Sequence, residues 1–79
     1  MSNETIGKFL LNLYEKTGNN EIEYFDKYEI GEGIGLLDKK EVDDVVKVLV
    51  KDGFINIDAG IPKIRITEEG IEQIRNNQI

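Results

Sequence analysis

The segment from Asp38 to Gly53, DKKEVDDVVKVLVKDG, places the strongest constraint on what this chain can fold into. Its apolar residues recur three and four positions apart, the spacing that puts them on one face of an α-helix. Asp38 and Glu41 form a capping box at the start, and Gly53 is placed to end the helix. We therefore predict a helix from Asp38 to just before Gly53 that buries one apolar face: Val42, Val45, Val46, Leu49 and Val50.

The residues after this helix alternate between apolar and polar on both sides of DAGIP. Alternation is the period of a half-buried strand, so the pattern predicts a β-hairpin with a loop of about five residues. Ile64 and Ile66 then face inward, while Lys63 and Arg65 project together to the other side. Thr67 is expected to cap a last helix whose inward residues are Ile71 and Ile74.

The N-terminal half predicts two further helices and a short strand. Residues 5–17 carry apolar side chains at helical spacing ahead of Gly18: Ile6, Phe9, Leu10 and Leu13. The alternation in NNEIEYF, residues 19–25, indicates a short strand. Asp26 and Glu29 form a second capping box, so a short helix is expected from Lys27 to about Ile34.

Three glycines stand at every second position in this region: Gly31, Gly33 and Gly35. A phosphate-binding loop needs a buried strand before it and a βαβ unit around it, neither of which the pattern provides. Instead, Gly35 is expected to end the short helix at positive φ, and Gly31 to let the next helix approach closely. Gly33 is expected at an exposed helical position, where alanine would stabilise the domain by about 0.4–1 kcal/mol.

The composition excludes most kinds of catalytic and metal site. The chain has no Cys and no His, which removes a thiolate nucleophile, an imidazole base and the usual zinc ligands. Acidic pairs such as Asp43 with Asp44 are expected on exposed helix turns, where nothing would raise a carboxylate pKa. We predict a non-enzymatic protein without cofactor or metal, built as one domain over residues 1–79. The sequence contains no membrane span and no signal peptide, so a cytoplasmic location without membrane contact is expected.

Two segments resemble winged helix-turn-helix regulators of the MarR-like and PadR-like kinds. EIGEGIGL looks like the second helix and turn, and LDKKEVDDVVKVLVKDGFINI with IRITEEGIEQI is similar to the recognition helix, wing and last helix. The resemblance implies an α+β, mostly helical fold: a winged helix in which a three-helix core carries a short strand and a β-hairpin wing, plus a C-terminal helix. The turn GLLD is one residue longer than the usual pattern.

The resemblance implies a small DNA-binding, transcription-type regulator that contacts double-stranded DNA. The candidate nucleic-acid-binding residues are Lys39, Lys40, Lys47, Lys63 and Arg65. The predicted helical phase places three bases and two acids on the outer face of the recognition helix, with Glu41 beside them: Lys40, Asp43, Asp44, Lys47 and Lys51. Carboxylates are repelled by the DNA backbone, and the chain has a net charge of -6. We therefore expect DNA binding to be weak.

The alternative is an acidic winged-helix module that binds a protein partner and no DNA. Val48 lies off the inward face, and three tyrosines combine apolar rings with polar tips, as interface residues do: Tyr14, Tyr24 and Tyr28. The same tyrosines are also ordinary half-buried residues, which leaves both interpretations open. In either case a monomer or a homodimer is expected, and Ile71, Ile74 and Ile79 are the candidate dimer contacts.

Overall fold

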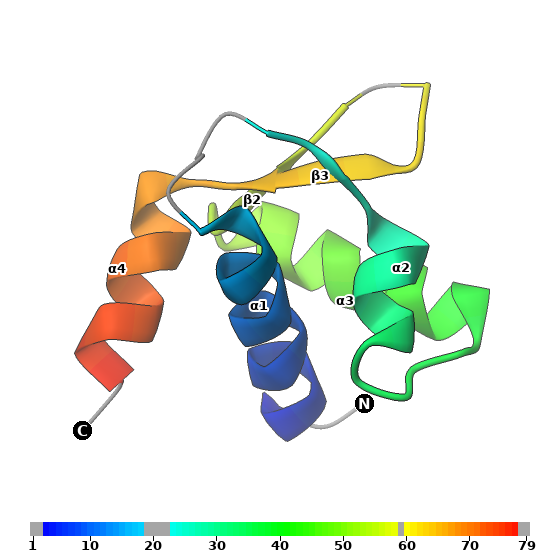
Figure 1. The fold of residues 1–79 in the computed structure, drawn as a ribbon, viewed down its shortest axis with the longest axis horizontal. Helices are drawn as coiled ribbons and strands as arrows, with labels where there is room; N and C mark the ends of the chain where they lie inside the picture. The colour runs from blue at the N-terminus through cyan, green and yellow to red at the C-terminus, as the bar shows by residue number, and fades with distance from the viewer. Residues whose placement is uncertain (1–2, 19–22, 59, 78–79) are drawn as a thin grey trace.

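The computed structural model describes residues 3–18, 23–58 and 60–77, and within them the elements follow the predicted order (Figure 1). The chain is α+β, with helices at both ends and a small sheet between. The elements are α1 (Asn3–Thr17), β1 (Phe25–Asp26), α2 (Lys27–Glu32), α3 (Lys39–Lys51), β2 (Ile55–Ile57), β3 (Lys63–Ile66) and α4 (Glu68–Asn77).

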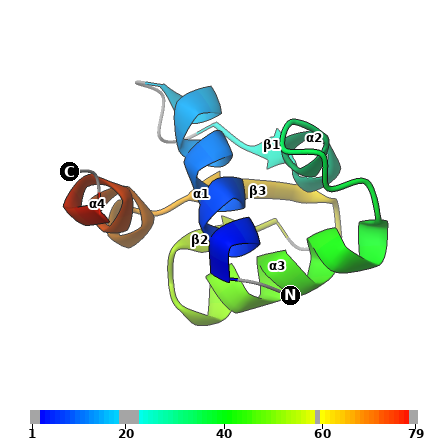
Figure 2. The same cartoon turned by 90° about the horizontal axis from the view of Figure 1, so that it is seen from below.

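The sheet is antiparallel, and β3 is its central strand. The strand order is β1-β3-β2, with Phe25 opposite Ile64 on one side and Ile57 opposite Ile64 on the other. The hairpin loop occupies residues 58–62, as predicted, although Ala59 lies outside the described residues. The sheet crosses above α1, with α2 and α4 on opposite sides of that helix (Figures 1 and 2).

The first strand is shorter than predicted and lies closer to α2. Residues 19–22 are outside the described part of the chain, and the pairing with β3 includes only Phe25 and Asp26. The strand ends there because the helical turn begins at once: Asp26 Oδ1 accepts a hydrogen bond of 2.8 Å from the N–H of Tyr28. The N–H of Lys27 donates to the carbonyl of Pro62 at 2.8 Å, which ties the start of α2 to the hairpin loop.

The predicted inward face of α3 is confirmed except at one position. The side chains of Val42, Val45, Val46 and Leu49 are buried, together with Phe9, Leu10 and Leu13 of α1 and the isoleucines of the sheet. Val50 was predicted to join them but is 38% exposed. It lies on the flank of α3 that faces α2. Because α2 contacts α3 at Lys39, Val42 and Asp43, this short helix does not reach the last turn.

In the α2–α3 connection, Gly31 packs closely against α3 and Gly35 has a positive φ, as predicted, but Gly33 rather than Gly35 caps the end of α2. An added Cβ at Gly31 would lie 2.7 Å from Cγ2 of Val42, so only glycine allows this close packing. The helix ends at Glu32, two residues earlier than expected, but its hydrogen-bonded turn continues: the N–H of Leu36 donates to the carbonyl of Gly31 at 2.8 Å. Gly35 adopts φ +78 in this turn, the conformation that favours glycine.

The expectation for Gly33 is confirmed in part. The residue is exposed, but it lies just after α2 rather than inside the helix, and an added Cβ would lie 2.5 Å from Nδ2 of Asn12. That amide donates to the carbonyl of Ile30 at 2.9 Å and so connects α1 to α2. Glycine at position 33 leaves room for the Asn12 side chain, which the local sequence pattern does not indicate.

The start of α4 follows the prediction. Thr67 Oγ1 accepts a hydrogen bond from the N–H of Gly70 at 3.1 Å, which is an N-cap, and donates to the carbonyl of Gly53 at 2.6 Å. The side chains of Ile71 and Ile74 are buried. Ile79, the third candidate dimer contact, lies outside the described residues.

Candidate nucleic-acid interface

The solvent side of α3 carries a strip of charged residues that we call the outer strip: Lys40, Asp44, Lys47 and Lys51. The buried valines fix the rotation of the helix, and Asp38 Oδ1 fixes its start by accepting from the N–H of Lys40 at 2.9 Å. The three lysines are exposed and Asp44 is partly exposed. The strip therefore presents three positive charges and one negative charge to solvent.

Asp43 lies at the edge of this strip: its side chain is 43% exposed, in line with the predicted outward direction, but it is paired with α2, which was not predicted. Its Oδ1 lies 2.9 Å from Nζ of Lys27 and accepts a hydrogen bond of 3.0 Å from the hydroxyl of Tyr28. Both partners come from the first turn of α2, and the Lys27 side chain is only 13% exposed. We call these three residues the α2–α3 clamp.

Each member of the clamp has a pKa shifted in the direction that preserves the contact. The hydrogen bond from Lys27 lowers the pKa of the Asp43 carboxyl. The same hydrogen bond raises the pKa of Lys27, and the hydrogen bond to Asp43 raises the pKa of the Tyr28 hydroxyl. A carboxylate, an ammonium and a neutral phenol are the forms favoured, so the fold itself balances the negative charge of Asp43.

Lys39 belongs with the clamp rather than with the outer strip. Its Nζ lies 5.2 Å from the centroid of the Tyr28 ring, within the range of a cation–π contact. Lys27 Nζ is 5.3 Å from the same ring. Lys39 therefore has an internal partner, although it remains exposed.

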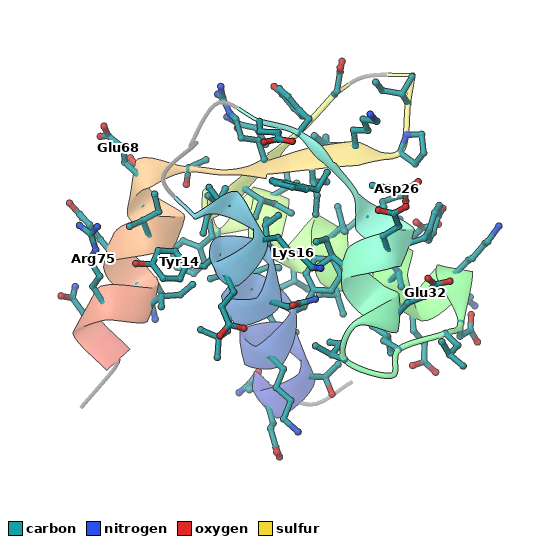
Figure 3. The ribbon with its side chains drawn as sticks, in the orientation of Figure 1. Tyr14, Lys16, Asp26, Glu32, Glu68 and Arg75 are labelled. Atoms are coloured by element: carbon teal, nitrogen blue, oxygen red, sulfur yellow. The ribbon has the colours of Figure 1, made fainter. Side chains whose placement is uncertain are left out.

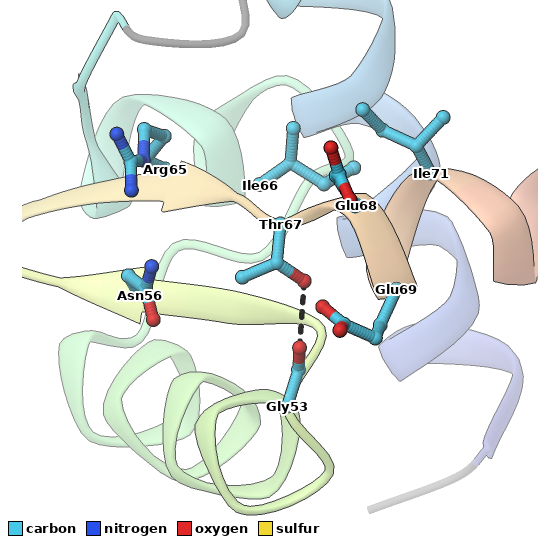
Figure 4. Close-up of a pocket in the computed structure, with 8 residues that line it drawn as sticks. All are labelled: Gly53, Asn56, Arg65, Ile66, Thr67, Glu68, Glu69 and Ile71. Carbon is cyan, nitrogen blue, oxygen red and sulfur yellow. Dashed lines mark hydrogen bonds between the residues drawn. The ribbon is translucent and has the colours of Figure 1, made fainter.

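Lys63 and Arg65 point to the outer face of the sheet, as the alternation predicted, because Ile64 and Ile66 are buried beneath it. The Arg65 guanidinium carbon lies 5.4 Å from the centroid of the Tyr24 ring. Arg65 also borders an open hollow with Asn56, Glu68 and Glu69 (Figure 4). The five candidate residues are thus divided among the outer strip, the clamp and the sheet face, and do not form one patch.

Sequence reasoning missed Lys27 and the part that Tyr28 plays in the clamp. The capping box at Asp26 does place both residues in the first turn of α2. However, their contact with Asp43 depends on how α2 crosses α3, which no local pattern encodes. Tyr14 and Tyr28 are half-buried against the core, and Tyr14 points from α1 toward α4 (Figure 3).

A second surface feature lies between α1, α3 and α4, and we call it the apolar groove. Leu11 and Val48 are 36% and 39% exposed on its two banks, beside the half-buried side chains of Ile6 and Phe54. The groove has a volume of about 460 Å³ and also contains the polar side chains of Asn3, Asp52 and Gln73. It is the setting of Val48, the residue that the sequence suggested as a protein contact.

Comparisons with known protein families, with curated proteins and with solved structures find no match to the chain. In the part of the chain that the structure describes, no helix has the length and apolar character needed to cross a membrane. The candidate interface therefore has to be judged from its own geometry and charge.

Proposed function

We propose that the chain is a winged-helix domain that binds double-stranded DNA through the outer strip of α3, as a transcription-type regulator. The order of elements supports this interpretation, because the hairpin follows α3 directly and pairs with a short strand placed before α2. This is the layout that the sequence resemblance implies. In such a domain the helix before the wing is the one that contacts the DNA.

The observation that carries the proposal is the pairing of Asp43 with Lys27 and Tyr28 in the α2–α3 clamp. Lys27 offsets the charge of this carboxylate, so the outer strip presents three lysines against Asp44, with Glu41 beside them. Lysines neutralise phosphates without reading bases, so the expected binding is salt-dependent and low in sequence specificity. The net charge of -6 keeps it weak.

The test is a titration of a fluorescently labelled DNA duplex, followed by anisotropy from low to moderate salt. Replacing Lys47 and Lys51 by Gln should weaken binding to all duplexes alike and reduce the slope of log K against log salt by about 0.9 for each phosphate that is no longer neutralised. Replacing Lys8 and Lys16 of α1 by Gln changes the net charge equally and is the matched control. A separate variant with Lys63 and Arg65 changed to Ala reports whether the sheet face takes part.

Equal weakening by the control pair would mean that only net charge matters and that α3 is not the binding face. Absence of binding by the folded wild type at low salt would reject the proposal. That result would favour the second candidate, an acidic winged-helix module that binds a protein partner and no DNA. The apolar groove is the specific observation in favour of this candidate.

A further inference from the structure

The apolar groove brings together exposed hydrophobic groups from two helices that are distant in sequence. Leu11 comes from α1 and Val48 from α3, and the described residues leave 36% and 39% of them exposed. The other exposed large apolar side chains of the described residues do not line this groove: Leu37, Val50, Ile57 and Ile61. Single exposed apolar residues are normal on a surface, whereas a set that lines one depression indicates an interaction site.

The floor of the groove is fixed by backbone contacts, so the groove is formed before any partner arrives. Phe54 follows Gly53, whose φ of +81 ends α3, and the N–H of Phe54 donates to the carbonyl of Leu49 at 2.9 Å. The carbonyl of Phe54 accepts from the N–H of Thr67 at 3.0 Å and lies directly against Gly70. A preformed groove reduces the entropic cost of binding a partner.

The charges at the groove specify the kind of partner. Among the described residues that line it, Asp52 is the one charged side chain. Glu41 lies on the same flank of α3, eleven residues before Asp52 and seven before Val48, which is close to whole helical turns. A partner that places Lys or Arg beside its apolar side chains would complement this acidic flank.

The same charges disfavour a second copy of the chain as the occupant. In a two-fold dimer the same patch is used by both subunits, so each acidic flank would approach its equivalent. Two chains of net charge -6 would add to that repulsion.

We propose that the apolar groove binds an amphipathic segment of another protein, in which apolar side chains about one helical turn apart are flanked by Lys or Arg. The site uses Leu11, Val48 and Phe54 for apolar contact and Asp52 for the basic flank. Its lining includes none of the outer-strip residues, so the two sites can be altered by separate substitutions. If the chain does bind DNA, the same molecule would join DNA to a protein partner.

The experiment uses two synthetic helical peptides with identical leucines, one flanked by lysines and the other by glutamates, titrated into the isotopically labelled chain and followed by NMR. The lysine peptide should shift the amide signals of Leu11, Val48, Phe54 and Gln73, and should bind at least about tenfold more tightly than the glutamate peptide. Asp52→Lys should reduce or reverse that preference.

A matched pair of variants separates the groove from general surface effects. Val48→Ser should weaken the lysine peptide by about fivefold, whereas Val50→Ser should leave it unchanged. The two valines are 39% and 38% exposed on the same helix, so the substitutions are equivalent apart from position. Thermal unfolding of each variant verifies that it is folded.

Equal affinity for the two peptides, or equal weakening by the two serine variants, would overturn the proposal. The proposal would also be overturned if the wild type sedimented as a dimer and Val48→Ser made it a monomer. The occupant of the groove would then be a second copy of the chain. If the outer-strip variants lose DNA binding but still bind the lysine peptide, the groove and the DNA-binding face are separate sites.

Discussion

The helices α2 and α4 flank α1 on opposite sides (Figure 2), but different interactions hold them in place. Polar side chains from neighbouring helices hold much of α2: Asp43 bonds to Lys27 and Tyr28, and Asn12 bonds to the carbonyl of Ile30. Apolar packing of Ile71 and Ile74 holds α4, with Thr67 joining its start to the end of α3. The position of α4 therefore depends chiefly on apolar packing, whereas that of α2 combines the burial of Ile30 with side-chain hydrogen bonds, of which those in the clamp involve groups that titrate.

The largest expected effect is on the α4 side. Gly70→Ala would place a Cβ against the carbonyl of Phe54, which is already fixed by its hydrogen bond from Thr67. Overpacking of this kind costs about 1–3 kcal/mol. The matched variant Gly31→Ala meets a methyl group of Val42 at 2.7 Å and the carbonyl of Leu36 at 2.9 Å on the α2 side.

Urea denaturation followed by circular dichroism measures both variants. We expect Gly70→Ala to lower the free energy of unfolding more than Gly31→Ala, because the closest contact of the new Cβ is with the backbone carbonyl of Phe54 in the first variant and with a side-chain methyl group in the second. If Gly31→Ala were the more destabilising of the two, the packing around α2 would be more rigid than that around α4.

The next effect tests the link between α1 and α2. Gly33→Ala should destabilise the chain by about 1 kcal/mol, since the new Cβ displaces the Asn12 amide from the carbonyl of Ile30 and leaves that hydrogen bond unmade. In an Asn12→Ala background the same substitution should become neutral or stabilising, because Gly33 has φ -62 and ψ -18, which alanine adopts without strain while restricting the unfolded chain. A double-mutant cycle by urea denaturation measures the coupling. If Gly33→Ala changed the free energy of unfolding equally in both backgrounds, contact with Asn12 would not be the reason for glycine at position 33.

The smallest effect is the pH dependence of the clamp. The pKa of Asp43 is lowered, so its contribution to stability is present above its ordinary pKa and is lost as pH falls through the lower folded value. The pKa of Lys27 is raised, so its contribution is present below its ordinary pKa and is lost as pH rises through the higher folded value. Asp43→Asn should therefore reduce stability by about 1 kcal/mol or less between roughly pH 4 and pH 10, with the difference from the wild type shrinking at both ends.

Thermal unfolding across that pH range measures the clamp effect. Asp44→Asn is the control, because it removes the same charge one residue away without touching Lys27. If both variants gave the same pH profile, the contact between Asp43 and Lys27 would contribute nothing to stability.

This comparison also explains which parts could be predicted from the sequence. The patterns that define α3, the hairpin and α4 are local: valines at helical spacing, alternating isoleucines, and a Thr cap before an amphipathic helix. The α2 region was predicted less well because its determinants are tertiary. Nothing near Gly33 in the sequence points to Asn12, and nothing near Asp43 points to Lys27.

The candidate site shows the same limit. The exposure of Lys40 and Lys47 followed from the helical phase, and the outward direction of Lys63 and Arg65 followed from the alternation in β3. The pairing of Asp43 with α2 did not follow, since helical phase specifies direction but not the neighbours from another helix. The position of Val48 in a groove with Leu11 could not be predicted either, because it depends on how α1 packs against α3.

The contacts of Thr67 have a consequence for how this chain can change over evolution. Its side chain bonds to Gly53 and its N–H to Phe54, so the two ends of the hairpin are joined at the base, independently of the loop. Lengthening the loop ahead of Pro62, whose carbonyl accepts from Lys27, would then cost little beyond closure entropy, about 0.6 kcal/mol for each doubling in length. The present loop contains no basic residue. A longer, lysine-rich loop inserted there would give the hairpin new phosphate contacts while the helices keep their positions.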